Sequence, residues 1–335
     1  MDCSARCAIL NHNIDEGLGM DWSRFNLDRQ PFRPAVDSDS YFPSPSHEAA
    51  LASVAAGFAR REQAVLLDGP PGVGKTLIAR KWLEHLLPEV PRVMLPSSRA
   101  EKPGELLQAI LFDLGKPYQG LTEQELRLSV TECMLEAAAA SGYPTVLILD
   151  EAQHLSQAAL EELRLLGNLE TKRGSAVFVL LVAHQTLRAA LRRPGYELFA
   201  QRVGVRSEIE VLTQEESVAY LNHQVRAAGG EPDSLFESDA LTMIAEACGG
   251  VPRVLNRAAA LSIELAGESG TTVVDVEAAL EALDRLELEP VESEETTESG
   301  EPVLLPHPGR GPDGIPDDVN AESGPKNRST RPRIA

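Results

Sequence analysis

The sequence predicts an α/β fold in which helices sandwich a parallel sheet, with a small all-helical domain after it. Three observations lead to this fold. Short apolar runs with the length of buried strands alternate with helical segments over about the first two-thirds of the chain. A glycine-rich loop at 69–76 joins one such strand to a helix. Beyond about residue 211 only helical patterns remain.

The elements of the α/β part are placed by capping residues and by the spacing of apolar side chains. Ser46 is expected to cap a helix over 47–60, whose apolar positions fall on one face. Continuous apolar runs predict strands of a parallel sheet, because such a sheet is buried on both faces. The predicted strands are 64–67, 92–95, 145–149, 176–182 and 205–211, and the predicted helices are 75–86, 103–114, 123–140 and 160–169.

Composition divides the chain into four predicted segments. A lead-in segment at 1–46 precedes the α/β domain at 47–211, a helical lid domain at 212–286 and a tail at 287–335. Proline, aspartate and aromatic residues indicate that 21–46 is extended and not helical. The helices predicted for the lid domain are 214–228, 238–248, 252–265 and 275–284.

The two ends of the chain carry expectations of their own. Residues 1–19 are polar and irregular, and we expect translation to start at Met20. The tail is rich in proline, glutamate and glycine. It offers too little apolar surface to fold alone, so we predict that it is disordered.

The formal net charge is −20, and the acidic excess is not confined to the tail. A field of that sign repels nucleic acid and anionic lipid at long range, which makes DNA the disfavoured partner. A local patch of Arg188, Arg192 and Arg193 is the feature that would allow DNA binding in spite of this field.

The four cysteines form no recognisable framework. Cys133 and Cys248 fall in helical segments and are predicted to be buried thiols, whereas Cys3 and Cys7 lack the second ligand pair of a zinc site. A chain without disulfides suits a reducing compartment. No apolar run is long enough to span a bilayer and no signal peptide is recognised, so we expect a cytoplasmic protein.

The loop at 69–76 matches the pattern G-x-x-x-x-G-K-[ST] at every fixed position. Glycines let the backbone N–H groups face phosphate oxygens, and the helix that follows adds the positive end of its dipole. Lys75 is predicted to reach the β and γ phosphates of ATP, and the Thr76 hydroxyl to ligate Mg²⁺. The predicted nucleotide contacts are Gly69, Pro70, Pro71, Gly72, Val73, Gly74, Lys75, Thr76 and Leu77.

Two adjacent carboxylates, Asp150 and Glu151, follow the apolar strand at 145–149. The carboxyl edge of a parallel sheet is where ligands bind, so these side chains are expected beside the loop at 69–76. We predict that Asp150 holds Mg²⁺ and that Glu151 polarises the attacking water as general base. Together with the loop, this pair predicts hydrolysis of MgATP.

Further polar residues are candidates for contact with the γ-phosphate. The strand at 176–182 is followed by His184 and Gln185, either of which would contact the phosphate or the water unless the segment is an ordinary polar loop. Arg202 precedes a strand and is predicted to project into a neighbouring subunit's ATP, with Arg206 as its competitor. Arg253 opens a lid helix and is predicted to couple the nucleotide state to the lid.

Taken in order, these features resemble the AAA+ ATPases, specifically the ExeA/GspA-like group linked to general secretion. The resemblance covers about 21–284. Its motifs are Pro31-Phe32, Asp37, Tyr41-Phe42, Ser46-His47, Ala50-Leu51, the loop at 69–76, LDEAQ at 149–153, LFAQR at 198–202 and GVPRVLN at 250–256.

The resemblance implies roles for individual residues. Tyr41 and Phe42 would lie near the adenine, Arg202 would be the trans-acting arginine finger and Arg253 the second sensor. Two departures stand out. The tail has neither the membrane helix nor the peptidoglycan-binding part common in secretion members, and His184-Gln185 replaces the usual Asn or Thr of the first sensor.

The leading hypothesis is an oligomeric AAA+ ATPase that remodels or assembles an unidentified partner complex of a secretion or pilus system. One alternative is a DNA-linked transposition regulator of the TnsC or TniB type. Another is a nucleotide-gated switch with little turnover, against which Glu151 argues. A helicase is disfavoured, because one ATPase core and a small helical domain leave no room for a second motor domain.

Overall fold

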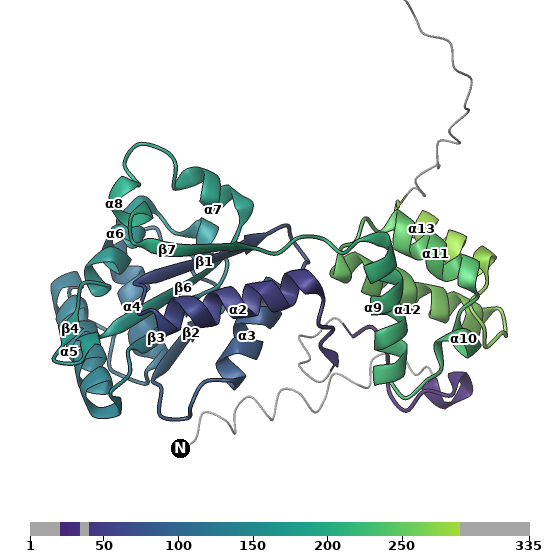
Figure 1. Ribbon diagram of the computed structural model, residues 1–335, viewed down its shortest axis with the longest axis horizontal. Helices are drawn as coiled ribbons and strands as arrows, with labels where there is room; N and C mark the ends of the chain where they lie inside the picture. Colours follow the sequence, from purple (N-terminus) through teal and green to yellow (C-terminus); the bar gives the residue numbers. More distant parts are fainter. Residues whose placement is uncertain (1–20, 34–39, 289–335) are drawn as a thin grey trace, which may run out of the picture. The chain divides into compact units, whose positions relative to one another are not determined.

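The computed structural model describes residues 21–33 and 40–288 (Figure 1). Several predictions fall outside the described residues: the start at Met20, the cysteines Cys3 and Cys7, Asp37 of the resemblance motif, and the tail beyond residue 288.

Five parallel strands form the main sheet, in the order β2-β3-β6-β1-β7. Their bounds are Ala64–Gly69 for β1, Arg92–Leu95 for β2, Thr145–Leu149 for β3, Val177–His184 for β6 and Val203–Glu208 for β7. The three interior strands β3, β6 and β1 are buried along almost their whole length, which is why they are continuous apolar runs in the sequence. The predicted α/β fold with a parallel sheet is confirmed.

Alternate side chains of each strand enter two different hydrophobic cores, because successive residues of a strand point to opposite faces. Leu66 and Leu147 pack on one face with α4 (Pro103–Asp113), α5 (Glu123–Ser141) and α6 (Gln157–Leu166). Val65 and Val146 pack on the other with α2 (Pro45–Ala59) and α3 (Lys75–Glu84). Helices therefore cover both faces of the sheet, as Figure 1 shows.

The N-terminal cap of α2 was predicted two residues too late. Ser44, not Ser46, caps the helix: its Oγ accepts a hydrogen bond from the His47 backbone N–H at 3.3 Å. Pro45 then occupies the first helical position, where its missing N–H costs nothing. Ser46 Oγ instead accepts from the backbone N–H of Glu210 at 2.9 Å, close to the end of β7.

Other boundaries and several short elements also differ from prediction. The helix predicted at 160–169 is α6, which starts earlier because Ser156 caps it, and the strand predicted at 205–211 is β7 at Val203–Glu208. The sequence analysis missed elements too short to show periodicity: the helices α7 (Gln185–Ala190), α8 (Glu197–Ala200) and α10 (Pro232–Leu235), the 3-10 helix η3 (Ala152–His154) and the hairpin of β4 (Glu170–Thr171) and β5 (Gly174–Ser175).

The helical part contains α9 (Gln214–Ala227), α11 (Ser238–Ala247), α12 (Pro252–Glu268) and α13 (Val276–Arg285), close to the four predicted helices. These helices share a core of their own. The lead-in contributes Phe25, Leu27 and Phe32 to that core. It is not wholly extended as predicted, because Trp22–Phe25 form the 3-10 helix η1 under an Asp21 side-chain cap.

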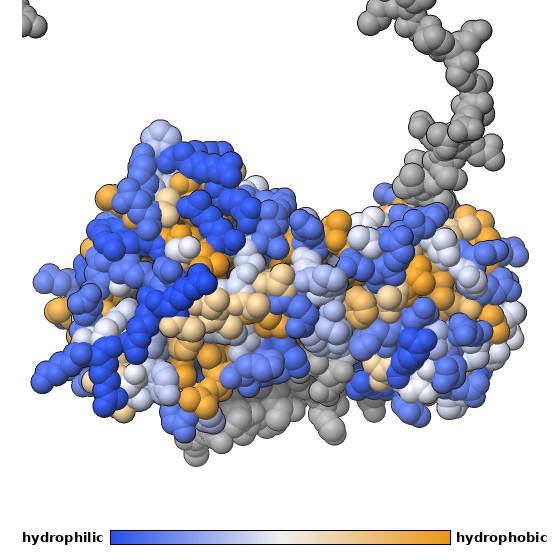
Figure 2. All heavy atoms as spheres, viewed as in Figure 1, coloured by the Kyte–Doolittle hydropathy of each residue, from blue (hydrophilic) through white to orange (hydrophobic). Residues whose placement is uncertain are grey.

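Two other expectations concern thiols and membranes. Cys248 is buried, as predicted, whereas Cys133 is only half-buried. Among residues 21–33 and 40–288, none of the helices combines the length and hydrophobicity needed to cross a bilayer. Figure 2 shows hydrophilic residues over most of the visible face, with smaller apolar areas among them.

Candidate nucleotide-binding site

The predicted phosphate-binding loop lies between β1 and α3, where the sequence analysis placed it. Gly72 and Gly74 have φ values of 83° and 97°, a left-handed conformation that favours glycine. Space is a second constraint at both positions. A Cβ on Gly72 would lie 2.9 Å from Arg253 Cβ, and one on Gly74 would lie 3.1 Å from His47 Nε2.

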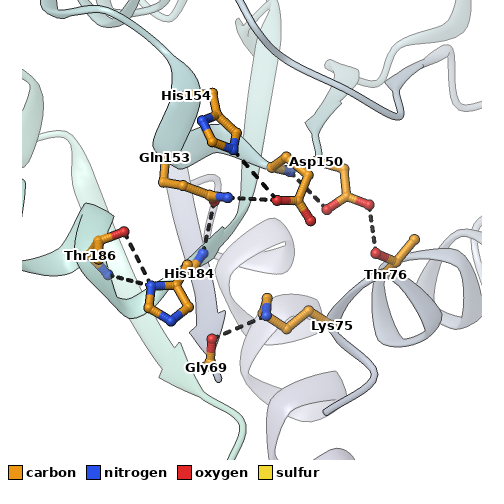
Figure 3. Close-up of polar contacts among 9 residues, drawn as sticks. Gly69, Lys75, Thr76, Asp150, Gln153, His154, His184 and Thr186 are labelled. Atoms are coloured by element: carbon orange, nitrogen blue, oxygen red, sulfur yellow. Dashed lines mark hydrogen bonds and ion pairs between the residues drawn. The ribbon is translucent and has the colours of Figure 1, made fainter. Parts of the chain in front are cut away.

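The Lys75 side chain is folded back over its own loop (Figure 3). Its Nζ donates to the carbonyl oxygens of Gly69 and Pro70 at 3.1 and 2.7 Å. Burial lowers the pKa of Lys75, while the nearby carboxylates of Glu151 and Asp150 act in the opposite direction. A half-buried ammonium group whose contacts are neutral carbonyls suits a phosphate, which would supply the missing negative charge.

Thr76 and Asp150 meet directly: Thr76 Oγ1 donates to Asp150 Oδ2 at 2.6 Å (Figure 3). Asp150 is buried at the end of β3. Its pKa is raised, chiefly by burial, and the Thr76 hydrogen bond opposes that shift. The backbone of Asp150 is fixed from both sides, because its N–H donates to Leu95 and its carbonyl accepts from Ser98.

A hydroxyl and a carboxylate are hard oxygen ligands of the kind that Mg²⁺ takes together with substrate phosphates. In the described part of the chain, no group of three or more His, Cys, Asp or Glu side chains is arranged to hold a metal. Thr76 and Asp150 therefore fit a magnesium ion that would take its remaining ligands from phosphate oxygens and water. When bound there, such an ion would neutralise charge on the phosphates.

Glu151 is adjacent to Asp150 in sequence, but the two carboxylates have different partners: Gln153 for Glu151 and Thr76 for Asp150. The backbone of Glu151 is left-handed, with φ 54° and ψ 36°, a conformation that is uncommon for glutamate and often marks a functional site. Its side chain is about half exposed, at 52%. The Glu151 carboxylate is thus accessible to water while Asp150 faces Thr76, which separates the predicted base from the predicted metal ligand.

Gln153, part of the LDEAQ motif at 149–153, has no predicted role but contacts the predicted base. Its Nε2 donates to Glu151 Oε2 at 2.6 Å, and its Oε1 accepts from the backbone N–H of His184 at 2.9 Å (Figure 3). The short helix η3 makes this bridge, because it turns the chain back toward β6 immediately after Glu151. The only sequence signal was the position of Gln153 two residues after Glu151.

His184 and Gln185 occupy different surroundings at the end of β6. His184 pairs with Gly69 in the sheet, and its ring Nδ1 lies 3.2 Å from Thr186 Oγ1 and caps α7 (Figure 3). The Gln185 amide donates to Glu208 Oε1 at 2.6 Å, at the end of β7. His184 is therefore beside the phosphate-binding loop, whereas the Gln185 side chain is bonded to the end of β7, on the far side of β1 from β6.

A buried ion pair stands directly before the loop. Asp68 is fully buried, and its Oδ1 contacts Arg188 at 2.5 Å, while Arg188 also contacts Glu208 at 2.7 Å. Burial raises the pKa of Asp68, and the hydrogen bond and charge of Arg188 oppose that shift. Arg188, predicted as part of a DNA-binding patch, is thus engaged with two carboxylates.

Arg202 lies just before β7, the strand at one edge of the sheet, and Arg206 lies within it. Arg202 immediately precedes β7, and its carbonyl accepts from the N–H of Ala64 at the start of β1. The loop follows the other end of β1, about 20 Å away for a six-residue strand. Arg206 lies midway along β7, donating to the Ala200 carbonyl at 3.2 Å. Arg202 is therefore remote from the loop of its own chain.

Arg253 lies beside the loop. It is the second residue of α12, and its backbone N–H donates to the Gly72 carbonyl at 3.3 Å. Its charge is close enough to lower the pKa of Lys75, in the same direction as the larger effect of burial. The predicted second-sensor residue and the loop are thus brought together.

Tyr41 and Phe42 both lie just before α2 in the chain but contact different elements. Tyr41 Oη donates to Glu48 at 2.7 Å, and Lys81 Nζ lies 5.6 Å from the centre of its ring. Phe42 packs edge to face on Tyr220 at 5.7 Å. Tyr41 therefore contacts residues of α2 and α3, and Phe42 contacts α9 of the helical part. That the two rings lie near the adenine stays a prediction from the resemblance.

The fold and this site define a protein of the AAA+ class of P-loop proteins. Residues 59–191 match the AAA domain family. The chain is also similar to General secretion pathway protein A of Aeromonas hydrophila, with 33% identity over 233 residues that cover 69% of this chain. The resemblance to the ExeA/GspA-like AAA+ proteins is confirmed. The chain spans 42% of that relative's length.

Solved structures share the fold at low sequence identity. Cdc6p from Pyrobaculum aerophilum superposes with a TM-score of 0.62 at 20% identity, covering 79% of this chain and 71% of its own. The ORC2 protein of Aeropyrum pernix gives 0.59 at 17% identity, with 80% and 72% covered. The RuvB branch migration motor of Thermotoga maritima gives 0.53 at 21% identity, with 77% and 74% covered.

Proposed function

We propose that this protein binds MgATP in the loop at 69–76 and hydrolyses it. The observation that carries the proposal is the 2.6 Å hydrogen bond from Thr76 Oγ1 to Asp150 Oδ2, which joins the end of the phosphate loop to the end of β3. Lys75, held over the loop, would exchange its carbonyl contacts for phosphate oxygens. Glu151, exposed and adjacent, would take the proton of the attacking water.

The proposal includes an oligomer in which neighbouring subunits share the ATP site. Arg202 supports it, because this exposed arginine lies at the sheet edge opposite its own phosphate loop and can stabilise a transition state only in another copy. An exposed apolar residue stands one helical turn earlier: Leu198 is 60% exposed beside a hollow of about 160 Å³ that Leu160 and Phe199 also line. A second copy covering this surface would bury Leu198 and receive Arg202.

The partner complex on which the protein would act is proposed only from its similarity to General secretion pathway protein A. General secretion pathway protein A is linked by its name to secretion, and we propose that this chain likewise assembles or remodels a partner complex of a secretion or pilus system in the cytoplasm. The partner itself is not identified by the site.

Steady-state ATP hydrolysis tests the enzymatic part of the proposal. The specific rate of the wild type should rise with protein concentration, and Glu151→Gln should abolish it while ATP binding remains. A mixture of Arg202→Ala with Glu151→Ala should recover activity, because a mixed site can combine Glu151 of one subunit with Arg202 of the other. A flat and near-zero wild-type rate with intact ATP binding would favour a nucleotide-gated switch.

The DNA-linked alternative is weakened by the structure. Of the three arginines that would form a basic patch, Arg188 is paired with Asp68 and Glu208, which leaves the exposed Arg192 and Arg193. Drosophila ORC and the ORC1 protein of Aeropyrum pernix, both solved with DNA bound, share only the fold with this chain, at 17% and 19% identity. Salt-sensitive retention of DNA on filters in the presence of ATP would revive this alternative.

A further inference from the structure

The carbonyl groups of the phosphate-binding loop are held by donors on several elements. In a planar trans peptide the C=O and the following N–H point in opposite directions, so each carbonyl partner also orients an N–H. The carbonyls of Gly69 and Pro70 accept from Lys75 Nζ, and that of Gly72 accepts from the Arg253 N–H. The carbonyl of Val73 contacts His47 Nε2 at 2.8 Å.

His47 is a buried imidazole, 5% exposed, that reaches the loop from α2. A backbone carbonyl can only accept, so Nε2 carries the proton and donates to Val73. The other ring nitrogen, Nδ1, lies 2.8 Å from Ser44 Oγ and therefore accepts from that hydroxyl. Ser44 is fully buried, so the ring is fixed in one tautomer and one orientation. Burial also lowers the pKa of His47, which favours the neutral ring that this tautomer requires.

The Val73–Gly74 peptide transmits this contact to the inside of the loop. With the Val73 carbonyl directed at His47, the Gly74 N–H is directed the opposite way. Within the described residues, no acceptor engages the N–H of Val73 or Gly74. Gly74 cannot be replaced without displacing His47, since a Cβ there would lie 3.1 Å from Nε2. An N–H held in this way without an acceptor is suited to bind a phosphate oxygen.

We propose that His47 is a positioning residue for phosphate binding: it holds the Val73–Gly74 peptide so that the Gly74 N–H faces the phosphate. The role rests on the proposed binding of nucleotide and needs no contact between His47 and ATP. Without this donor the buried Val73 carbonyl lacks a partner, and the peptide would turn to find one. The loop would then lose a phosphate donor even in a folded protein.

Two amide replacements, each of which places a nitrogen near the position of one ring nitrogen, separate this role from simple packing. In His47→Gln the amide nitrogen replaces Nε2 and can still donate to the Val73 carbonyl. In His47→Asn the shorter amide replaces Nδ1 and cannot reach Val73. His85→Asn is the matched control, because it removes an exposed imidazole at the end of α3.

The measurement is isothermal titration of the full chain with MgATP and with MgADP, together with the thermal midpoint of each variant. We expect His47→Asn to raise Kd for both nucleotides about tenfold, or about 1.4 kcal/mol. His47→Gln should stay within about threefold of the wild type, as His85→Asn should. Rescue by Gln, at a thermal midpoint similar to that of Asn, would support the proposal.

Other outcomes would overturn it. Equal Kd values for His47→Asn and the wild type would show that the loop holds its shape without this donor. Equal weakening by Gln and Asn would make His47 a packing residue. A wild type that binds neither nucleotide would overturn the proposed function and this role together, whereas normal wild-type binding with unaffected variants would overturn this role alone.

Discussion

Gln153 Nε2 donates a hydrogen bond of 2.6 Å to Glu151 Oε2, and the same amide accepts from the His184 N–H at the end of the neighbouring strand. Glutamine can do both, because its side chain has a donor and an acceptor. The proposed base is therefore tied to the strand that lies between β3 and the phosphate loop's own strand β1. Its orientation depends on a residue that does not react.

Replacing Gln153 should therefore impair hydrolysis more than binding. Gln153→Leu removes both bonds, and Gln153→Glu keeps an acceptor for His184 but loses the donor to Glu151. We expect both variants to lower kcat about tenfold with KM within about threefold, because orientation of a general base acts mainly on the chemical step. Gln119→Leu, in the loop between α4 and α5, is the control. Unchanged kcat in Gln153→Glu would refute this dependence on the donor.

The Thr76–Asp150 contact predicts a magnesium-dependent defect. Asp150→Asn should retain ATP binding in the absence of Mg²⁺ but lose most of the gain in affinity that Mg²⁺ gives the wild type, because an amide is a weaker ligand than a carboxylate. Thr76→Ser keeps the hydroxyl and should behave as the wild type. Titration of fluorescent ATP with and without Mg²⁺ measures both. A full magnesium effect in Asp150→Asn would remove Asp150 from the metal site.

The buried pair of Asp68 and Arg188 predicts that loss of the arginine is strongly destabilising and that a second substitution at Asp68 compensates for it. Arg188→Leu would leave the Asp68 carboxylate, 0% exposed, without its cation, and should lower the free energy of unfolding by about 3 kcal/mol. Adding Asp68→Asn should restore much of that loss, because the buried charge is then gone. Denaturant unfolding of the single and double variants checks this. Additive losses in the double variant would show that the pair is not coupled.

His47 also predicts how stability depends on pH. Burial lowers its pKa below the ordinary value of 6.5, against the attraction of Glu216 and Glu48, so the unfolded chain binds the proton more readily than the folded one. The stability that neutral His47 contributes is present above pH 6.5 and is lost as pH falls below that value toward the folded pKa. The difference in unfolding free energy between wild type and His47→Gln should therefore shift against the wild type on acidification. A difference that stays constant over this range would contradict the assignment.

Local patterns were enough to predict the sheet and the two chemical motifs. The strands at 64–67 and 145–149 were recognisable because interior parallel strands are apolar throughout, and the spacing of the glycines and Lys75 depends on neighbouring residues alone. The cap of α2 was misplaced because Ser44 and Ser46 are both good caps. The choice between them depends on Pro45 and on the hydrogen bond that the Glu210 N–H donates to Ser46 Oγ. Elements such as η3 and α8 are shorter than the windows in which periodicity can be seen.

The sequence by itself determined the class of protein, the residues of the phosphate loop and the Asp-Glu pair, because each is a short run whose meaning depends on adjacent residues. The tertiary structure decided which distant groups complete the site. His47 on α2 and Arg253 on α12 meet the loop only through folding, and Gln153 joins the proposed base to the His184 N–H, 31 residues away. Arg188 is paired with a carboxylate 120 residues away, which takes it out of the predicted basic patch. Hydrogen bonds and ion pairs between such residues depend on distances in space, which separation along a chain does not encode.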